Sequence, residues 1–160
     1  QGSTEAPLIL TPHVGEMARL VGTNKEAILK DRLVTIRQFA TSHSLFVVLK
    51  GPSSLIATPD GRIFVNPTGN AGLGTAGAGD TLTGLIAGFV AQEFATNGSK
   101  ADAASATVAA LFVGGRAGDL AASKYGMRCM VASYVRDMFG AAIMSLNLAG
   151  EQPGIASRIA

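Results

Sequence analysis

The sequence has little cysteine and little charge, and each shortage limits what the protein can be. Its single cysteine, Cys129, has no partner for a disulfide within the 160 residues. This fits a reducing compartment, and we expect the residue to pack in the core. Charged residues make up 15% of the chain, the net charge is +2, and the charges form no basic stripe. This pattern argues against nucleic acid as a partner.

The sequence also lacks a long apolar run. The longest stretch of small and apolar residues, from Ala103 to Gly115, is too short to span a bilayer, and Arg116 and Asp119 follow it. The polar N-terminal residues show no signal or transit peptide. We therefore expect a soluble, cytoplasmic protein that does not bind membranes. Its length and its 48% apolar content predict one domain over residues 1–160 with a sizeable core.

Glycine, in contrast, is abundant, and six of the 20 glycines lie between Asn66 and Gly84. Gly77-Ala78-Gly79 lead directly into Asp80 and an apolar-periodic segment. Free N–H groups at the start of a helix, preceded by a glycine-rich loop, can bind a phosphate group. A carboxylate is a poor ligand for an anion, but it is well placed as a base beside one. The segment therefore predicts phosphoryl transfer to a hydroxyl, with Asp80 as the base.

Three other interpretations compete for the same segment. Asp80 alone could be a favourable charge at the start of a helix. Gly72 to Gly77 match the dinucleotide pattern G-x-G-x-x-G, but Glu93, the acidic residue at the required spacing, lies late in a predicted helix and no strand surrounds it. A Walker A loop is excluded because no lysine follows these glycines.

Hydrophobic patterns and turn residues predict the order of the elements. We expect strands at 8–10, 45–49, 54–57 and 62–65, the last two as a hairpin, and helices at 16–21, 24–40, 79–95, 101–123 and 130–146. Strands joined by long helical connections predict a layered α/β fold with a mainly parallel sheet.

Polar motifs follow three of these elements, at 11–13, at 50–54 and in the glycine loop. Ligands in such folds bind at the carboxyl ends of strands, so we expect the three motifs to form one site. Each motif alone has a simpler explanation. His13 can be satisfied by the backbone, Lys50 can be a solvated strand end, and Glu16 can be a favourable charge at a helix start.

With these motifs in view, the chain resembles the ADP-dependent NAD(P)H-hydrate dehydratases of the ribokinase-like superfamily. The resemblance runs from about Leu8 to Ile143. It rests on Thr-Pro-His-x-Gly-Glu at 11–16, Val-Leu-Lys-Gly at 48–51, Thr-Pro-Asp-Gly at 58–61, Asn-Pro-Thr-Gly-Asn at 66–70 and Gly-x-Gly-Asp at 77–80. It implies a ribokinase-like layered fold whose N-terminal portion is absent from this chain. Val14 and Ala71 stand where the family usually has proline, and Ser54 stands where threonine is common.

The resemblance also implies a role for each matched residue. His13, Asn70 and Asp80 would contact the hydrated dinucleotide, with Asp80 acting on its hydroxyl. The adenine nucleotide would be held by Lys50, Gly51, Pro52, Ser53, Ser54, Gly77, Ala78 and Gly79. ADP with Mg²⁺ would phosphorylate the hydroxyl that water has added to the nicotinamide ring of NADH or NADPH, and elimination would restore the ring and release AMP and phosphate. No side chain is assigned as a metal ligand.

Partners and two other functions complete the expectations. Besides its small-molecule substrates we expect a homo-oligomer, together with a missing N-terminal segment or a fused epimerase domain. A ribokinase-like kinase of a small alcohol, such as a vitamin precursor, would share Asp80 and the anion site, and would differ near His13 and Asn70. A noncatalytic nucleotide-binding fragment would fit the missing N-terminal half.

Overall fold

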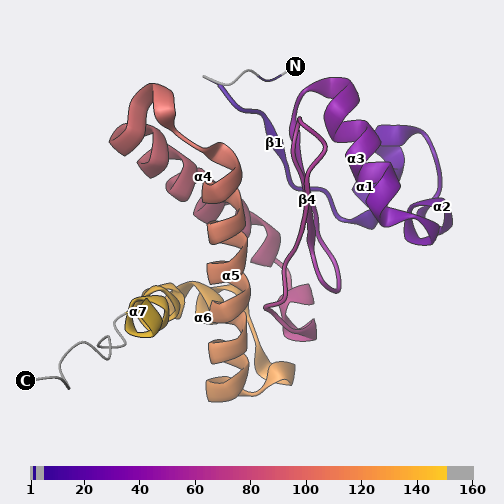
Figure 1. Cartoon of the computed structure of the whole chain (residues 1–160). Coiled ribbons are helices and arrows are strands. Elements are labelled where there is room, and N and C mark those ends of the chain that lie inside the picture. The colour runs from indigo at the N-terminus through magenta and orange to yellow at the C-terminus, as the bar shows by residue number, and fades with distance from the viewer. Residues whose placement is uncertain (1, 3–5, 151–160) are drawn as a thin grey trace, which may run out of the picture.

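The computed structural model describes residue 2 and residues 6–150. Figure 1 shows helices α1 (Val14–Val21), α2 (Lys25–Lys30) and α3 (Arg32–His43) on one side of a sheet, and α4 (Ala78–Asn97) and α5 (Ala103–Tyr125) on the other. The strands are β1 (Ile9–Leu10), β2 (Phe46–Leu49), β3 (Leu55–Ala57) and β4 (Ile63–Val65). The remaining described elements are α6 (Ala132–Asp137), α7 (Phe139–Gly150) and the short 3-10 turns η1 (Ala71–Gly74), η2 (Gly98–Lys100) and η3 (Met127–Cys129). The expected layered α/β fold is confirmed.

The strand pairing differs in part from the mainly parallel sheet that we predicted. The strands lie in the order β1-β2-β3-β4. β1 and β2 are parallel, whereas β3 pairs antiparallel with both β2 and β4, with Val48 opposite Ile56. The reason is local: the short connections at 50–54 and 58–62 reverse the chain, and a parallel neighbour needs a long crossover such as α1–α3. The predicted hairpin of β3 and β4 is confirmed.

Strand β2 divides the hydrophobic core between the two helical layers. All four of its residues are buried, and successive side chains point to opposite faces. Val47 and Leu49 pack with Met17 and its neighbours from α1–α3, whereas Val48 packs with Leu111 and the α4–α5 layer. Each such aliphatic side chain contributes about 1.5–3 kcal/mol when it is fully buried. The strand that directly precedes Lys50 is therefore firmly anchored.

Two helices that the sequence predicts as continuous are each broken in two. The segment 24–40 divides into α2 and α3 at Asp31, which has φ −147° and ψ 72° and caps α3. The segment 130–146 divides into α6 and α7 at Met138. Apolar spacing continues across both breaks because the two helices of each pair bury residues in the same cluster. Periodicity alone therefore could not reveal either break.

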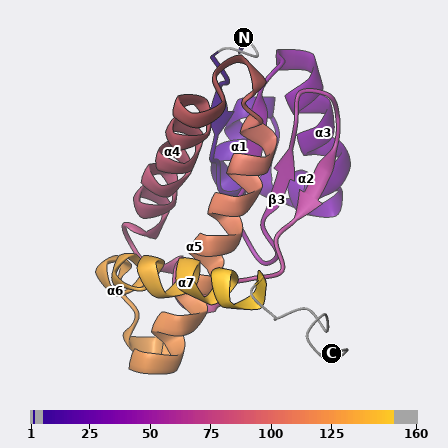
Figure 2. The ribbon, with the colours of Figure 1, turned by 60° about the vertical axis from the view of Figure 1, so that its left-hand side comes forward.

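Helix α5 is the scaffold of the second layer. Most of its buried residues are alanine and glycine, and these small side chains let neighbouring helices approach closely. Figure 2 shows α4 beside α5 and α7 crossing the C-terminal half of α5, in agreement with the contacts between these helices. Cys129 is exposed on the surface turn η3 between α5 and α6, so the prediction that it packs in the core is wrong. Within the described residues, every helix is too short or too polar to cross a membrane.

Candidate active site

The first two polar motifs meet beside the start of α4. His13 and Lys50 form a parallel bridge that extends the pairing of β1 and β2, and Lys50 N–H donates to Pro12 O at 2.9 Å. The hydroxyl oxygens of Thr11 and Thr83 are 3.2 Å apart, which joins the end of β1 to α4. The ends of two parallel strands and the start of a helix thus form one edge, as the fold rule predicts.

His13 caps helix α1, and this holds its ring in one orientation. Its Nδ1 accepts hydrogen bonds from the N–H groups of Gly15 (3.0 Å) and Glu16 (3.1 Å). Because Nδ1 accepts, Nε2 carries the hydrogen of the neutral ring, and it lies 3.4 Å from Glu16 Oε1. The simpler interpretation of His13, a ring bound by backbone, is therefore confirmed for Nδ1. The exposed Nε2 edge is the part that can meet a ligand.

Glu16 links His13 to Lys50. Its carboxylate accepts a hydrogen bond from His13 N–H at 2.7 Å, and its Oε2 lies 3.8 Å from Lys50 Nζ. The hydrogen bond from His13 is the main cause that lowers the pKa of Glu16; burial opposes this shift and the charge of Lys50 adds to it. The carboxylate therefore keeps its charge at neutral pH and holds the ammonium group of Lys50 in place.

Lys50 carries its charge to the N-terminus of α4. A Cβ atom added to Gly79 would lie 3.2 Å from Lys50 Nζ. Gly77 precedes the helix with φ 80°, a conformation that glycine adopts freely, and no side chain of the described residues caps this end. Neither Gly79 N–H nor Asp80 N–H has an acceptor among the described residues. A helix N-terminus carries a partial positive charge, so a cation beside it is unfavourable unless an anion binds there too.

Asp80 lies in the first turn of α4 and is exposed. In the described part of the chain its carboxylate forms neither an ion pair nor a hydrogen bond. The nearby hydroxyls of Thr81 and Thr83 are engaged instead with the carbonyls of Gly77 (2.8 Å) and Gly79 (3.0 Å). A carboxylate left free beside an anion site can accept a proton from a ligand.

The segment 51–54, expected to hold the adenine nucleotide, is a tight turn directly after β2. Ser54 Oγ donates to Gly51 O at 3.1 Å. Arg32, at the start of α3, donates from Nη1 to Pro52 O at 2.9 Å and from Nη2 to Ser53 O at 3.2 Å. A side chain from the α1–α3 layer thus holds this turn of the sheet.

Asn70, an expected substrate contact, is bound within the glycine loop and to α5. Its Nδ2 donates to Asp119 Oδ1 at 3.0 Å, and its Oδ1 accepts from Gly72 N–H at 3.0 Å. Gly69 N–H donates to Asp119 Oδ2 at 3.0 Å. Among the described residues no hydrogen bond joins Asn70 to His13, Lys50 or Asp80, so its role in substrate binding stays a prediction.

The start of the glycine loop is also locked against α5. Thr68 Oγ1 donates to Phe112 O at 2.9 Å, and Asn66 Nδ2 donates to Leu111 O at 3.3 Å. A Cβ on Gly115 would overlap Thr68 Oγ1, so the helix must have glycine there. Helix α5 therefore positions the loop that leads to α4.

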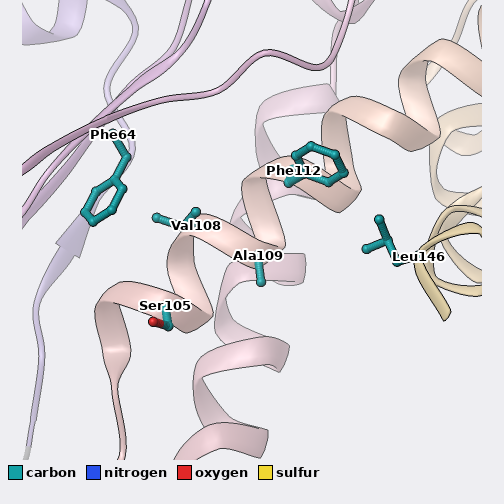
Figure 3. Close-up of a pocket in the computed structure, with 6 residues that line it drawn as sticks. All are labelled: Phe64, Ser105, Val108, Ala109, Phe112 and Leu146. Carbon is teal, nitrogen blue, oxygen red and sulfur yellow. The ribbon is translucent and has the colours of Figure 1, made fainter. Parts of the chain in front are cut away.

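Two cavities lie away from this site. Figure 3 shows the first, of about 300 Å³, whose almost wholly apolar lining comes from β4, α5 and α7 (Phe64, Ser105, Val108, Ala109, Phe112 and Leu146). The second, of about 460 Å³, lies near Pro7, Phe46 and Asp102. None of the expected site residues lines either cavity, because those residues sit on turns and helix starts at an open edge.

Comparison with known proteins shows the family to which the chain belongs. A sequence model of the family described as NAD(P)H-hydrate dehydratase matches residues 2–140. The chain belongs to this dehydratase family. A bifunctional NAD(P)H-hydrate repair enzyme from Moorella thermoacetica is 44% identical over 141 residues, which are 88% of this chain and 25% of that protein.

Solved structures agree with the dehydratase assignment. The ADP/ATP-dependent NAD(P)H-hydrate dehydratase from Bacillus subtilis, co-crystallised with ATP/Mg²⁺, is 31% identical with a TM-score of 0.77, over 87% of this chain and 48% of that one. A ribokinase-like superfamily protein from Enterococcus faecalis is 24% identical with a TM-score of 0.68, over 88% of this chain and 45% of that one. The second likeness concerns the fold alone. The ribokinase-like fold is thus confirmed, and the chain spans about half the length of these solved structures.

Two residues that organise the candidate site were not predicted from the sequence. Arg32 lay inside a helix predicted to be continuous, and Asp31, a good N-cap residue directly before it, was the signal that could have divided the helix. Asp119 lay in a helix rich in small residues, and its distance from Asn70 in the sequence concealed their contact.

Proposed function

We propose that this member of the dehydratase family removes water from hydrated NADH or NADPH, with ADP as the phosphoryl donor. The observation that carries the proposal is the position of Lys50 Nζ, 3.2 Å from a Cβ built on Gly79, against the uncapped start of α4. A phosphate group bound between them would remove the repulsion and would place a phosphorus atom near Asp80. The names of the relatives support the same reaction.

The proposed reaction has two steps. First, the ring hydroxyl attacks the β-phosphorus of ADP, its proton passes to the Asp80 carboxylate, and AMP leaves. Second, the phosphorylated oxygen leaves the ring as phosphate while a neighbouring ring carbon loses a proton, so the double bond forms again. Lys50 and the N–H groups of α4 would stabilise the charge on the transferred group. His13 Nε2 would donate a hydrogen bond to the dinucleotide.

Magnesium fits this site as a companion of the nucleotide. Among the residues that the structure describes, no three histidine, cysteine, aspartate or glutamate side chains lie close enough together to hold a metal ion. Mg²⁺ often keeps few protein ligands and binds phosphate oxygens, so it can enter with the nucleotide. When bound, the ion would neutralise phosphate charge.

The wider assignments are also proposals, because the chain spans 25% of the Moorella enzyme and about half of the solved relatives. We propose that residues 1–160 are the C-terminal portion of one ribokinase-like domain and that the whole protein is a homo-oligomer. ADP and reduced nicotinamide cofactors are cytoplasmic metabolites, so the expected location is the cytoplasm. The bifunctional name of the Moorella enzyme supports a second, fused activity, for which an epimerase domain is our proposal.

The test uses the full-length protein with hydrated NADH, Mg²⁺ and either ADP, ATP or no nucleotide. The absorbance of the reduced nicotinamide ring should return with ADP and should not return without nucleotide. Recovery of the absorbance with ATP but not with ADP would overturn the choice of ADP as the phosphoryl donor. If no nucleotide supports recovery, the dehydratase proposal fails. Phosphorylation of a small alcohol would then point to the kinase, and ADP binding without any turnover would point to the noncatalytic protein.

A further inference from the structure

Arg32 is bound to the turn that follows β2, although the two lie far apart in the sequence. Its guanidinium donates to two successive carbonyls, Nη1 to Pro52 O at 2.9 Å and Nη2 to Ser53 O at 3.2 Å. A planar guanidinium holds two such acceptors in fixed positions, which a lysine ammonium does not. Arg32 therefore sets the direction of both carbonyl groups in the 51–54 turn.

The break between α2 and α3 brings this side chain to the turn. Asp31 leaves the helical conformation and accepts a hydrogen bond from Val34 N–H at 3.2 Å, so a new helix begins at Arg32. Ile28 and Ile36, on either side of the break, are 1% and 0% exposed. The chain thus changes direction at Arg32 without losing either core residue.

The arrangement has two unfavourable features. Arg32 Nε is buried without a hydrogen-bond partner, and no carboxylate of the described residues pairs with the guanidinium. Ser53 has φ 48°, in the left-handed region that is unfavourable for residues other than glycine. Uncompensated polar groups and local backbone strain are concentrated at functional sites, where a ligand or a mechanism depends on them.

We propose that Arg32 is a positioning residue for adenine-nucleotide binding. It holds the carbonyl oxygens of Pro52 and Ser53 on its own side of the turn, away from phosphate groups that they would repel. The inference rests on the proposed function, because that function assigns the 51–54 turn to the nucleotide.

The test compares Arg32→Lys and Arg32→Ala with a control on the same helix. Arg37 also donates to a main-chain carbonyl, from Nε to Gly61 O at 3.1 Å, but at the β3–β4 turn. Calorimetric titration of the full-length protein with ADP and Mg²⁺ should show roughly tenfold weaker binding for both Arg32 variants, the order expected when a charge-assisted hydrogen bond is lost. Arg37→Ala should bind ADP like the native protein. Low millimolar guanidinium should restore binding by Arg32→Ala.

Steady-state kinetics provide the second readout. The KM for ADP should rise in Arg32→Lys while kcat and the KM for the hydrate stay near native. Native ADP affinity in both Arg32 variants would overturn the inference and leave the proposed function intact. Equal losses in the Arg32 and Arg37 variants, without rescue by guanidinium, would also overturn it, because Arg32 would then only support the fold. Failure of the native protein to bind any adenine nucleotide would overturn both the inference and the proposed function.

Discussion

Asn70 Nδ2 donates to Asp119 Oδ1 at 3.0 Å, and this bond ties the glycine loop to the C-terminal half of α5. The second oxygen of Asp119 accepts Gly69 N–H at the same distance. One carboxylate thus fixes two successive residues of the loop that precedes the proposed anion site. The loop and the helix are therefore expected to act as one unit.

Exchanging the two side chains tests this unit. In Asp119→Asn an NH₂ group replaces one carboxylate oxygen, so either Asn70 Nδ2 or Gly69 N–H loses its acceptor, and the unpaired donor should cost about 1–3 kcal/mol of stability. The double variant Asn70→Asp with Asp119→Asn restores a donor opposite an acceptor and should recover the thermal midpoint. Asp137→Asn, which removes an ion pair between exposed neighbours, is the control and should change little.

The same double variant tests the predicted role of Asn70. If Asn70 also contacts the dinucleotide, the KM for the hydrate stays high although the midpoint recovers. If both recover, Asn70 serves the loop alone, and its assignment to substrate binding is wrong. A double variant as unstable as Asp119→Asn would show that the pair does not organise the loop.

Lys50→Met tests the repulsion at the start of α4. The substitution keeps the apolar stem and removes the charge beside Gly79, so ADP binding should weaken by roughly tenfold or more. The thermal midpoint without ligand should change little, because the variant removes an unfavourable contact with the positive helix start together with the partly exposed pair with Glu16, which contributes little. Calorimetry and thermal unfolding measure the two effects. A large fall in the midpoint with unchanged ADP affinity would mean that Lys50 stabilises the fold and does not bind phosphate.

Asp102 provides a pH-dependent test of stability. It caps α5 by accepting from Ala104 N–H (3.0 Å), Ser105 N–H (3.2 Å) and Ser105 Oγ (2.7 Å). The bond from the Ser105 hydroxyl is the main cause that lowers the pKa of Asp102 below its ordinary 3.8. The stabilisation is therefore fully present above pH 3.8 and is lost as the pH falls through the lower folded-state pKa.

Asp102→Ala should accordingly lower the free energy of unfolding by about 1 kcal/mol at neutral pH. The difference from the native protein should shrink in acid, as measured by urea unfolding across this pH range. Asp137→Ala is the control and should show little difference at any pH. A difference for Asp102→Ala that is independent of pH would contradict the account of the cap.

The sequence predicts those parts of the site that depend on local patterns. The apolar run before Lys50 and the glycine-to-helix junction at Asp80 each have a signature within a few residues, and the meeting of the first two motifs beside α4 follows from the fold rule. The cap at His13 is not among these predictions, because the sequence predicts that helix from residue 16, whereas it begins at Val14. The short turn after Lys50 decides the antiparallel pairing of β2 with β3. The prediction of a mainly parallel sheet rested instead on the long helical connections elsewhere in the chain.

The contacts at Arg32 and Asp119 could not be predicted in this way. Both contacts depend on tertiary structure. Arg32 of α3 contacts the turn between β2 and β3, which belongs to the sheet. Asp119 contacts Asn70 only because Gly115 lets the glycine loop approach α5. The position of Asn70 shows the same limit. Its family motif suggested a ligand contact, whereas in the structure its amide forms hydrogen bonds with Asp119 and Gly72.

Gly79→Val distinguishes the anion site from the base. A side chain at this position would enter the space beside Lys50 Nζ, which lies 3.2 Å from the Cβ position. ADP binding should therefore weaken strongly, and turnover should fall because the nucleotide is not held. Titration calorimetry on the full-length variant measures the loss, and undiminished ADP affinity would place the phosphate elsewhere.

The central claim is that Asp80 is the base beside a phosphate site. Measuring both the ADP affinity and the turnover of Asp80→Asn in the full-length protein tests this claim most directly. Asparagine is nearly the same size and leaves the start of α4 in place, so ADP should bind as tightly as in the native protein. Turnover should fall by roughly 10²–10⁴-fold, the usual contribution of a positioned base. Near-native turnover would contradict the account and would reduce Asp80 to a favourable charge at the end of a helix.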